Sequence, residues 1–111
     1  MGKQRRYKKA TIERAIRRWT KAHSYDWRDA IFYDRAEWDA QCGGKARFPA
    51  DFVLITDSSD LYDLFVPLGT DDFMAFEAEM ERYNLCIELI DFTTISFEWI
   101  DTYKPLIIGL G

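Results

Sequence analysis

Histidine, cysteine and long apolar runs are scarce in this sequence, and each shortage excludes a class of protein. A Ser-His-Asp or Cys-His catalytic site would have to be built around His23, the one histidine, and no neighbouring pattern supports such a site. We expect His23 at a helix end or on the surface. Cys42 and Cys86 are too few for the disulfide framework of a small secreted domain. We expect two buried, reduced thiols, with one bridge as the alternative. The apolar runs are too short to cross a bilayer.

Motifs for metals and cofactors are missing as well. The two cysteines and the histidine match no familiar zinc spacing, and the Gly43-Gly44-Lys45 segment lacks the spacing of a phosphate-binding loop. Asp57 and Asp60 flank the end of an expected strand, where paired carboxylates could hold Mg²⁺, but the two serines between them favour a turn. We therefore expect no metal, no cofactor and no enzymatic activity. A metal-dependent nuclease using Asp57 and Asp60 is the last alternative.

The composition is that of a folded globular domain. The chain is 48% hydrophobic and 31% charged, which argues against disorder, and its 111 residues suit one domain. Aromatic residues reach 16%, a large supply for a small core, so we expect some rings at the surface, where Tyr and Trp suit partner contacts. The basic N-terminus has no apolar stretch behind it, so we expect no signal peptide and a cytoplasmic protein.

The first helix is expected over residues 12–23. Ile12, Ile16 and Trp19 recur at helical spacing, and Thr11 is the expected N-cap. The cations of this segment form a second stripe on the side opposite the apolar residues. This basic stripe consists of Arg14, Arg17, Arg18 and Lys21.

A strand and a second helix are expected next. Residues 30–33 are rich in β-formers. Asp34 and Glu37 match a capping box, with Asp in place of Ser or Thr, and predict a helix over 35–42 that stops at the following glycine. The alternative is one continuous helix from Asp26 onward.

The second half of the chain predicts two helices and three strands. The apolar run at 52–56 is typical of a central strand, and Thr70 is the expected cap of a long helix. The expected elements are a strand over 52–56, a short helix or turn over 61–65, a helix over 71–84 and strands over 85–92 and 95–100, with 104–111 as an edge strand or a frayed end.

Helices and strands mix without a regular βαβ rhythm, so the expected fold class is α+β. We expect a small, mostly antiparallel sheet packed against two to four helices. A single domain over residues 1–111 is expected, in which a basic arm over residues 1–10 leads into the first helix.

Charge is distributed very unevenly along the chain. Residues 1–21 hold nine cations and one acid, whereas residues 57–101 hold twelve acids and one cation, Arg82. The net charge of the whole chain is −4. Like charges this close repel one another, so local stability does not require the arrangement. Glu77 and Glu81, four residues apart on an expected helix, illustrate the cost.

Three explanations of the acidic segment are open. Its carboxylates could be solvated surface that keeps an aromatic domain soluble. They could lie against the basic helix, in the same chain or in a second copy as a homodimer. They could also imitate a nucleic-acid backbone and occupy the basic groove of a partner protein. The residues expected to bind such a partner are Asp60, Asp63, Asp71, Asp72, Glu77 and Glu81, with Tyr25 and Tyr33 as aromatic anchors.

The basic stripe has a separate interpretation as an arm for DNA or RNA. Its lysine and arginine side chains would contact phosphates and make binding strongly dependent on salt. The acidic remainder of the chain would repel nucleic acid within the Debye length of about 8–10 Å. We therefore rank a nucleic-acid-binding accessory factor second, and expect no membrane partner.

In size, acidity and lack of catalytic motifs, the chain resembles the small proteins that phages and other mobile elements deploy against host defence, anti-CRISPR proteins and DNA mimics among them. The resemblance implies stoichiometric inhibition of a nucleic-acid-handling complex, such as a CRISPR effector or another defence nuclease, in the host cytoplasm. We expect a non-enzymatic protein that binds, and inhibits, such a partner through an acidic face.

Overall fold

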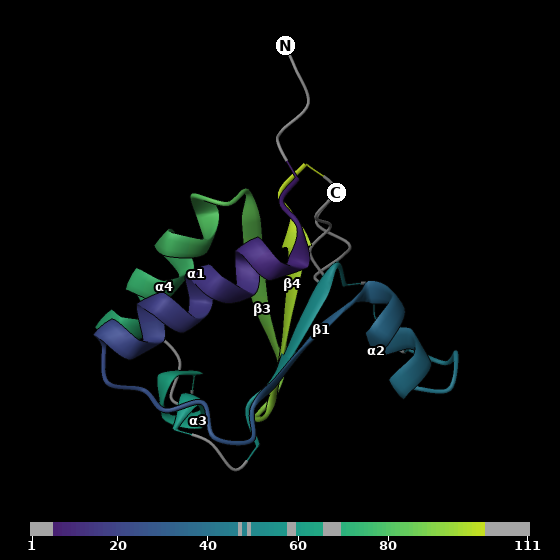
Figure 1. Cartoon of the computed structure of the whole chain (residues 1–111), viewed down its shortest axis with the longest axis horizontal. Coiled ribbons are helices and arrows are strands. Elements are labelled where there is room, and N and C mark those ends of the chain that lie inside the picture. Colours follow the sequence, from purple (N-terminus) through teal and green to yellow (C-terminus); the bar gives the residue numbers. More distant parts are fainter. Residues whose placement is uncertain (1–5, 47, 49, 58–59, 66–69, 102–111) are drawn as a thin grey trace, which may run out of the picture.

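The computed structural model describes residues 6–46, 48, 50–57, 60–65 and 70–101. These form four helices and four strands (Figure 1). In chain order they are α1 (Lys9–Ala22), β1 (Ile31–Asp34), α2 (Arg35–Gln41), β2 (Phe52–Ile55), α3 (Leu61–Phe65), α4 (Asp71–Glu81), β3 (Leu85–Asp91) and β4 (Thr94–Trp99). The expected edge strand or frayed end at 104–111 and most of the basic arm lie outside the described residues.

The strands form one antiparallel sheet in the order β1-β2-β4-β3. All three neighbouring pairs are antiparallel, and β3 and β4 form a hairpin. The apolar run of β2 lies in the middle of the sheet, as its composition predicts. The α+β class and the antiparallel sheet with helices are therefore confirmed.

The hydrophobic core lies between one face of the sheet and the helices α1, α3 and α4. Because side chains alternate along a strand, one set of alternate residues points to that face, as in the facing pairs Phe52–Phe97 and Leu54–Ile95. Ile12 and Ile16 of α1 and Phe76 of α4 are fully buried against them. Figure 1 shows α1 and α4 side by side on this face of the sheet.

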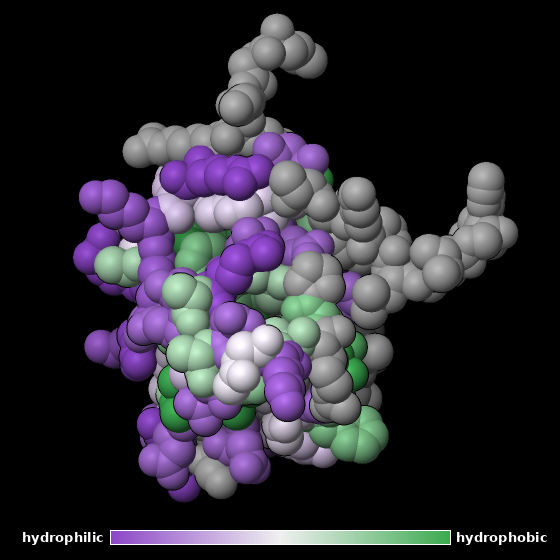
Figure 2. Space-filling view, turned by 90° about the vertical axis from the view of Figure 1, so that its right-hand side faces the viewer, coloured by the Kyte–Doolittle hydropathy of each residue, from purple (hydrophilic) through white to green (hydrophobic). Residues whose placement is uncertain are grey.

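The other face of the sheet carries α2. Tyr33 of β1 faces Val53 of β2 on this side, and the Tyr33 ring lies 5.6 Å from that of Trp38 in α2. Figure 1 shows α2 on the side of the sheet opposite α1, and Figure 2 views the molecule from there, with hydrophobic and hydrophilic side chains interspersed. No residue of α2 is buried, in contrast to α1 and α4.

The capping box at the start of α2 is present. Asp34 accepts a hydrogen bond from the backbone N–H of Glu37, and Glu37 accepts one from the backbone N–H of Asp34. These two bonds satisfy donors that a helix start leaves open, so the chain turns from β1 directly into α2. The alternative of one helix from Asp26 onward is wrong, because residues 31–34 pair with β2.

Three local predictions need correction. The first helix begins at Lys9, so Thr11 lies inside it, and Lys8 occupies the N-cap without a side-chain cap. The long helix ends at Glu81, although Thr70 caps it as expected by accepting from the Phe73 N–H. Both cysteines are free and only partly buried, so neither the single bridge nor two fully buried thiols is found.

Candidate binding surface

Carboxylates of the second half of the chain are poor in ion pairs. Of its twelve acids, Glu79 pairs with Arg82 and Asp101 pairs with Arg6. Nine others make no ion pair within 4.0 Å with any cation of the described residues. These nine are Asp57, Asp60, Asp63, Asp71, Asp72, Glu77, Glu81, Glu88 and Asp91.

One group of these acids surrounds Tyr25 at the α3 end of the molecule. The Tyr25 hydroxyl donates to Asp72 Oδ2 at 2.6 Å. The pKa of Tyr25 is raised to about 12, first by burial, then by the hydrogen bond to Asp72 and by the charges of Asp72 and Asp63. The Asp26 N–H donates to Asp60 Oδ2 at 3.3 Å, which brings Asp60 to the same place. We call Tyr25, Asp26, Asp60, Asp63 and Asp72 the tyrosine–aspartate cluster.

Local backbone geometry brings the cluster together. After α1 the chain turns sharply at Ser24, which has a φ of 66°, and the Tyr25 N–H donates back to the Thr20 carbonyl at 2.8 Å. This turn aims Tyr25 at the first turn of α4, where the Thr70 cap places Asp71 and Asp72. Acidic side chains are favourable there, because the N-terminus of a helix carries partial positive charge.

A second group lies beside β3. The pKa of the Cys86 thiol is raised to about 11, first by burial and then by the charges of Glu98, Glu81 and Glu88. Cys86 faces Glu98 directly across the β3–β4 pair. Cys86, Glu88 and Glu98 belong to the face of the sheet away from the core, and Glu81 acts on the thiol from the end of α4. We call Glu81, Glu88 and Glu98 the β3 carboxylates.

The six acids predicted to bind a partner do not share one patch. Asp60, Asp63 and Asp72 meet in the tyrosine–aspartate cluster, and Asp71 is the exposed neighbour of Asp72. Glu77 and Glu81 point elsewhere: Asp72 and Glu77 are separated by about 140° around α4, at 100° per residue. The acidic half therefore presents two areas, one around Tyr25 at the first turn of α4 and one that includes Glu77 and Glu81.

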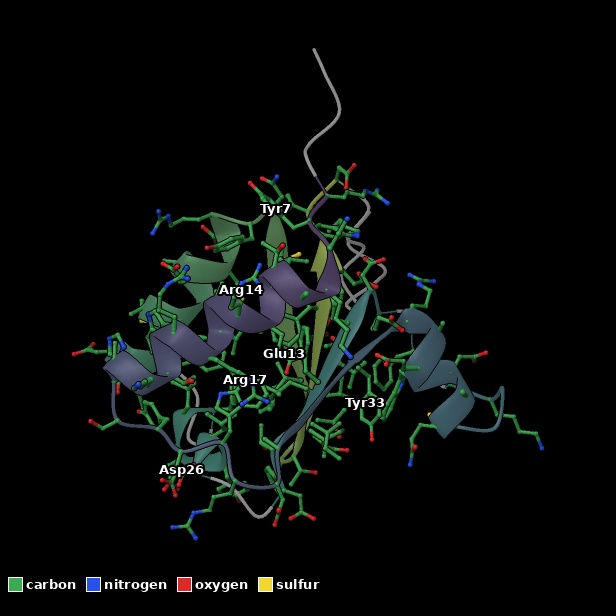
Figure 3. The ribbon with its side chains drawn as sticks, viewed as in Figure 1. Tyr7, Glu13, Arg14, Arg17, Asp26 and Tyr33 are labelled. Atoms are coloured by element: carbon green, nitrogen blue, oxygen red, sulfur yellow. The ribbon has the colours of Figure 1, made fainter. Side chains whose placement is uncertain are left out.

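The two aromatic anchors are separated as well. Tyr25 belongs to the tyrosine–aspartate cluster, whereas Tyr33 packs against Trp38 on the opposite face of the sheet. Figure 3 shows Tyr33 beside α2, away from Asp26 at the α3 end. The two tyrosines cannot serve one compact interface.

The basic stripe of α1 faces solvent, as its spacing predicts. Arg14, Arg17, Arg18 and Lys21 are all exposed. Arg17 pairs with Glu13 in its own helix and lies 3.9 Å above the ring of Trp27. Figure 3 shows Arg14, Arg17 and Glu13 along α1.

Contacts between α1 and the α4 region include a ring contact and a hydrogen bond. The Trp19 ring lies 5.2 Å from that of Phe76 in α4, and Arg18 donates at 3.1 Å to the hydroxyl of Tyr83, which follows α4. Among the described residues no ion pair joins the two helices. The basic helix does pack beside the acidic one, but it does not neutralise it.

Features that could support catalysis are sparse in the described residues. No group of three or more His, Cys, Asp or Glu side chains among them could hold a metal ion. Asp57 is exposed, and Asp60 is bound to the backbone of Asp26. A hollow of about 730 Å³ beside α2 is lined mainly by Trp38, Phe48 and alanines. His23 stacks on Trp19 at the end of α1 with a ring separation of 3.8 Å, in the helix-end position expected of it.

Two residues that matter for the surface escaped the sequence analysis. Glu88 lies in the strand that forms one edge of the sheet, and Phe92, 68% exposed, follows directly after that strand. The signal for Glu88 was present, since it belongs to the acidic segment, but its position at an edge depends on the strand order. Phe92 was expected to be the last residue of the strand over 85–92, whereas it lies in the turn that follows β3.

Comparisons of the chain with family models, with curated protein sequences and with solved structures found no match. Within the described residues, none of the helices combines the length and the apolar character needed to cross a membrane. The function of the protein must therefore be inferred from its surface.

Proposed function

We propose that this protein acts without catalysis, by binding a partner protein whose surface is basic, and that its acidic half makes the contact. The observation that carries the proposal is the set of nine carboxylates without an ion pair to the described residues. Carboxylates left unpaired keep their full field available for an incoming cationic surface. Exposed charges of this kind raise the association rate and set the register of a complex more than they supply its affinity.

The negative charge of the acidic half indicates the class of partner, because a binding partner must supply positive charge opposite it. Basic grooves of nucleic-acid-handling proteins carry dense arginine and lysine for phosphates, and closely spaced carboxylates can occupy the same positions. The two separate acidic areas suit a partner with two basic surfaces, or a long groove that contacts both. The resemblance to anti-defence proteins of phages supports the same partner class, with inhibition of a host nuclease as the result.

The test compares matched charge variants in affinity capture. The immobilised protein is exposed to a bacterial lysate cleared of nucleic acid, and bound proteins are identified by mass spectrometry. Asp63→Asn/Asp71→Asn and Glu77→Gln/Glu81→Gln each remove two negative charges from the acidic areas. Asp29→Asn/Asp39→Asn removes two charges from the other half and serves as the control. None of these six carboxylates carries an ion pair with a described residue.

The proposal expects capture of basic nucleic-acid-binding proteins, loss of capture in at least one acidic variant, and retention in the control. A captured nuclease should then lose its activity on addition of one equivalent of the protein. Capture that is equal in all variants, or that selects proteins without basic surfaces, contradicts the proposal.

A second candidate function is supported by the exposure of the basic stripe on α1. Arg14 and Lys21 make no ion pair with a described residue, and no carboxylate of α4 pairs with Arg17 or Arg18, so the exposed stripe could contact phosphates. In a gel shift, the unmodified protein would retard DNA or RNA at low salt, and Arg17→Glu with Arg18→Glu would abolish the shift. No shift at low salt would exclude this candidate and leave the first one unaffected.

A further inference from the structure

Among the residues that the structure describes, strand β3 forms one end of the sheet, and no strand pairs with its outer side. It is seven residues long, against four for β1 at the other end, which continues directly into α2. Proteins usually protect such an edge with lysine or other charged side chains, proline, a β-bulge or a covering element. The β3 sequence LCIELID contains neither lysine nor proline, and its charged residues are the acids Glu88 and Asp91.

Backbone direction shows which groups face outward. The Ser96 hydroxyl of β4 donates to the Glu88 carbonyl at 3.4 Å, so that carbonyl points toward β4. Along a strand the N–H and C=O of one residue point to one side and those of the next residue to the other. The backbone groups of Ile87 and Leu89 therefore point to the open edge, away from β4. A register irregularity between Leu89 and Asp91 ends the regular edge.

The negative charge near β3 indicates which kind of strand can pair with this edge. Glu88 lies on this strand between the two outward-facing residues, and Glu81 and Glu98 are close enough to act on the neighbouring Cys86. A second β3 strand, paired antiparallel through Ile87 and Leu89, would place Glu88 directly opposite its own copy. Like charges in that position are destabilising, whereas opposite charges stabilise a cross-strand pair. The edge therefore disfavours a homodimer and favours a cationic strand.

An aromatic anchor stands at the end of the same edge. Phe92 follows β3 in the turn to β4 and is 68% exposed. An aromatic side chain buries a large apolar area when a partner covers it.

The geometry points to β3 as a docking edge for an extended segment of the partner protein with lysine or arginine at alternate positions. The segment adds a fifth, antiparallel strand. Its backbone bonds to Ile87 and Leu89, its cations meet Glu88 and the other β3 carboxylates, and an apolar residue meets Phe92. The inference rests on the proposed function, for which it names the recognition mode.

The test uses a short blocked peptide in which Lys alternates with Thr. Amide hydrogen exchange is measured by NMR with and without the peptide. At saturation we expect exchange at Ile87 and Leu89 to slow about tenfold, because these N–H groups gain hydrogen-bond partners. Chemical-shift changes should be confined to β3 and the Phe92 turn.

Three controls separate the contributions. A peptide with Glu in place of Lys tests charge, and a Lys peptide methylated on alternate backbone nitrogens tests strand pairing. Glu88→Lys in the protein should weaken binding of the Lys peptide about tenfold, since an attractive cross-strand pair becomes repulsive. Asp39→Asn, on the other side of the molecule, should leave binding unchanged.

Each outcome bears on the inference. Protection at Ile87 and Leu89 that both peptide controls and Glu88→Lys abolish supports it. Equal binding of the methylated peptide, shifts centred on other elements, or no binding overturns it. If partner capture still depends on Asp63 and Asp71 while Glu88→Lys has no effect, the docking edge fails and the proposed function stands. If the Lys peptide adds to β3 but no basic protein is captured, the proposed function fails.

Discussion

The hydroxyl of Tyr25 donates a 2.6 Å hydrogen bond to the carboxylate of Asp72, 47 residues further along the chain. The bond joins the turn after α1 to the first turn of α4, in a part-buried position. A hydrogen bond to a charged acceptor is shorter and stronger than a neutral one. This contact therefore holds together the two elements that build the tyrosine–aspartate cluster.

Removal of this hydroxyl should destabilise the fold. We expect Tyr25→Phe to lower the free energy of unfolding by about 1–2 kcal/mol, because Asp72 loses its donor while the aromatic ring stays in place. Urea denaturation followed by circular dichroism measures the change. Tyr33→Phe is the matched control, since no hydrogen bond to the Tyr33 hydroxyl is found among the described contacts, and it should cost less. Equal costs for the two variants would contradict a structural role for the bond.

The same tyrosine predicts a loss of stability at high pH. Burial, aided by Asp72, raises the pKa of Tyr25 from its ordinary value of 10.0 to about 12 in the folded protein. A raised pKa gives stability that is fully present below the unfolded value and is lost as pH rises through the folded one. Between pH 10 and 12 the unmodified protein should therefore lose more stability than Tyr25→Phe. Parallel urea titrations across this range check the difference, and identical pH slopes would refute it.

A buried pair of hydrogen bonds holds the C-terminal end of α1. The Trp27 indole N–H donates to Thr20 Oγ1 at 2.9 Å, and Thr20 Oγ1 lies 2.9 Å from the Ile16 carbonyl that it donates to. Thr20→Val keeps the shape but leaves the indole N–H without a partner, which should cost about 1–3 kcal/mol. Thr20→Ser keeps the hydroxyl and should cost less. Chemical denaturation monitored by tryptophan fluorescence compares the two, and a reversed order would show that packing of the methyl group dominates.

The sequence was sufficient for the fold class because its local signals are strong and agree with one another. Asp34 and Glu37 predict the start of α2, Thr70 predicts the start of α4, and the apolar run of β2 predicts a central strand. The start of α1 was misplaced because Thr11 looks like an N-cap, although the chain is already helical from Lys9. Capping preference is a weak local term that the packing of a whole helix overrides.

The binding surface could be predicted only in composition. Counting charges locates the acidic segment, but the meeting of Tyr25 with Asp72 depends on a positive φ at Ser24, which no residue-type preference indicates. Separation of Asp72 from Glu77 follows from helix geometry once α4 is placed. The edge position of Glu88 depends on strand order, which is a property of the whole sheet.

A further prediction concerns the ion pair that ties α1 to α2. Lys9 Nζ lies 2.7 Å from Glu37 Oε1, and the same oxygen accepts the Asp34 N–H at 2.9 Å. The hydrogen bond from Lys9, followed by that from the Asp34 backbone, lowers the pKa of Glu37 below its ordinary value of 4.5. A lowered pKa gives stability that is present above the unfolded value and is lost as pH falls through the folded one.

Lys9→Met should therefore raise the pKa of Glu37, measured by an NMR titration of its side-chain carboxyl, and should reduce the loss of stability below pH 4.5. The expected change in stability at neutral pH is small, about 0–1 kcal/mol, because exposed ion pairs contribute little. Lys21→Met removes a cation that makes no ion pair with a described residue, and should leave the Glu37 titration unchanged. An unaltered Glu37 pKa in Lys9→Met would mean that the capping box alone sets the titration, and that α1 and α2 are held together by the sheet rather than by this pair.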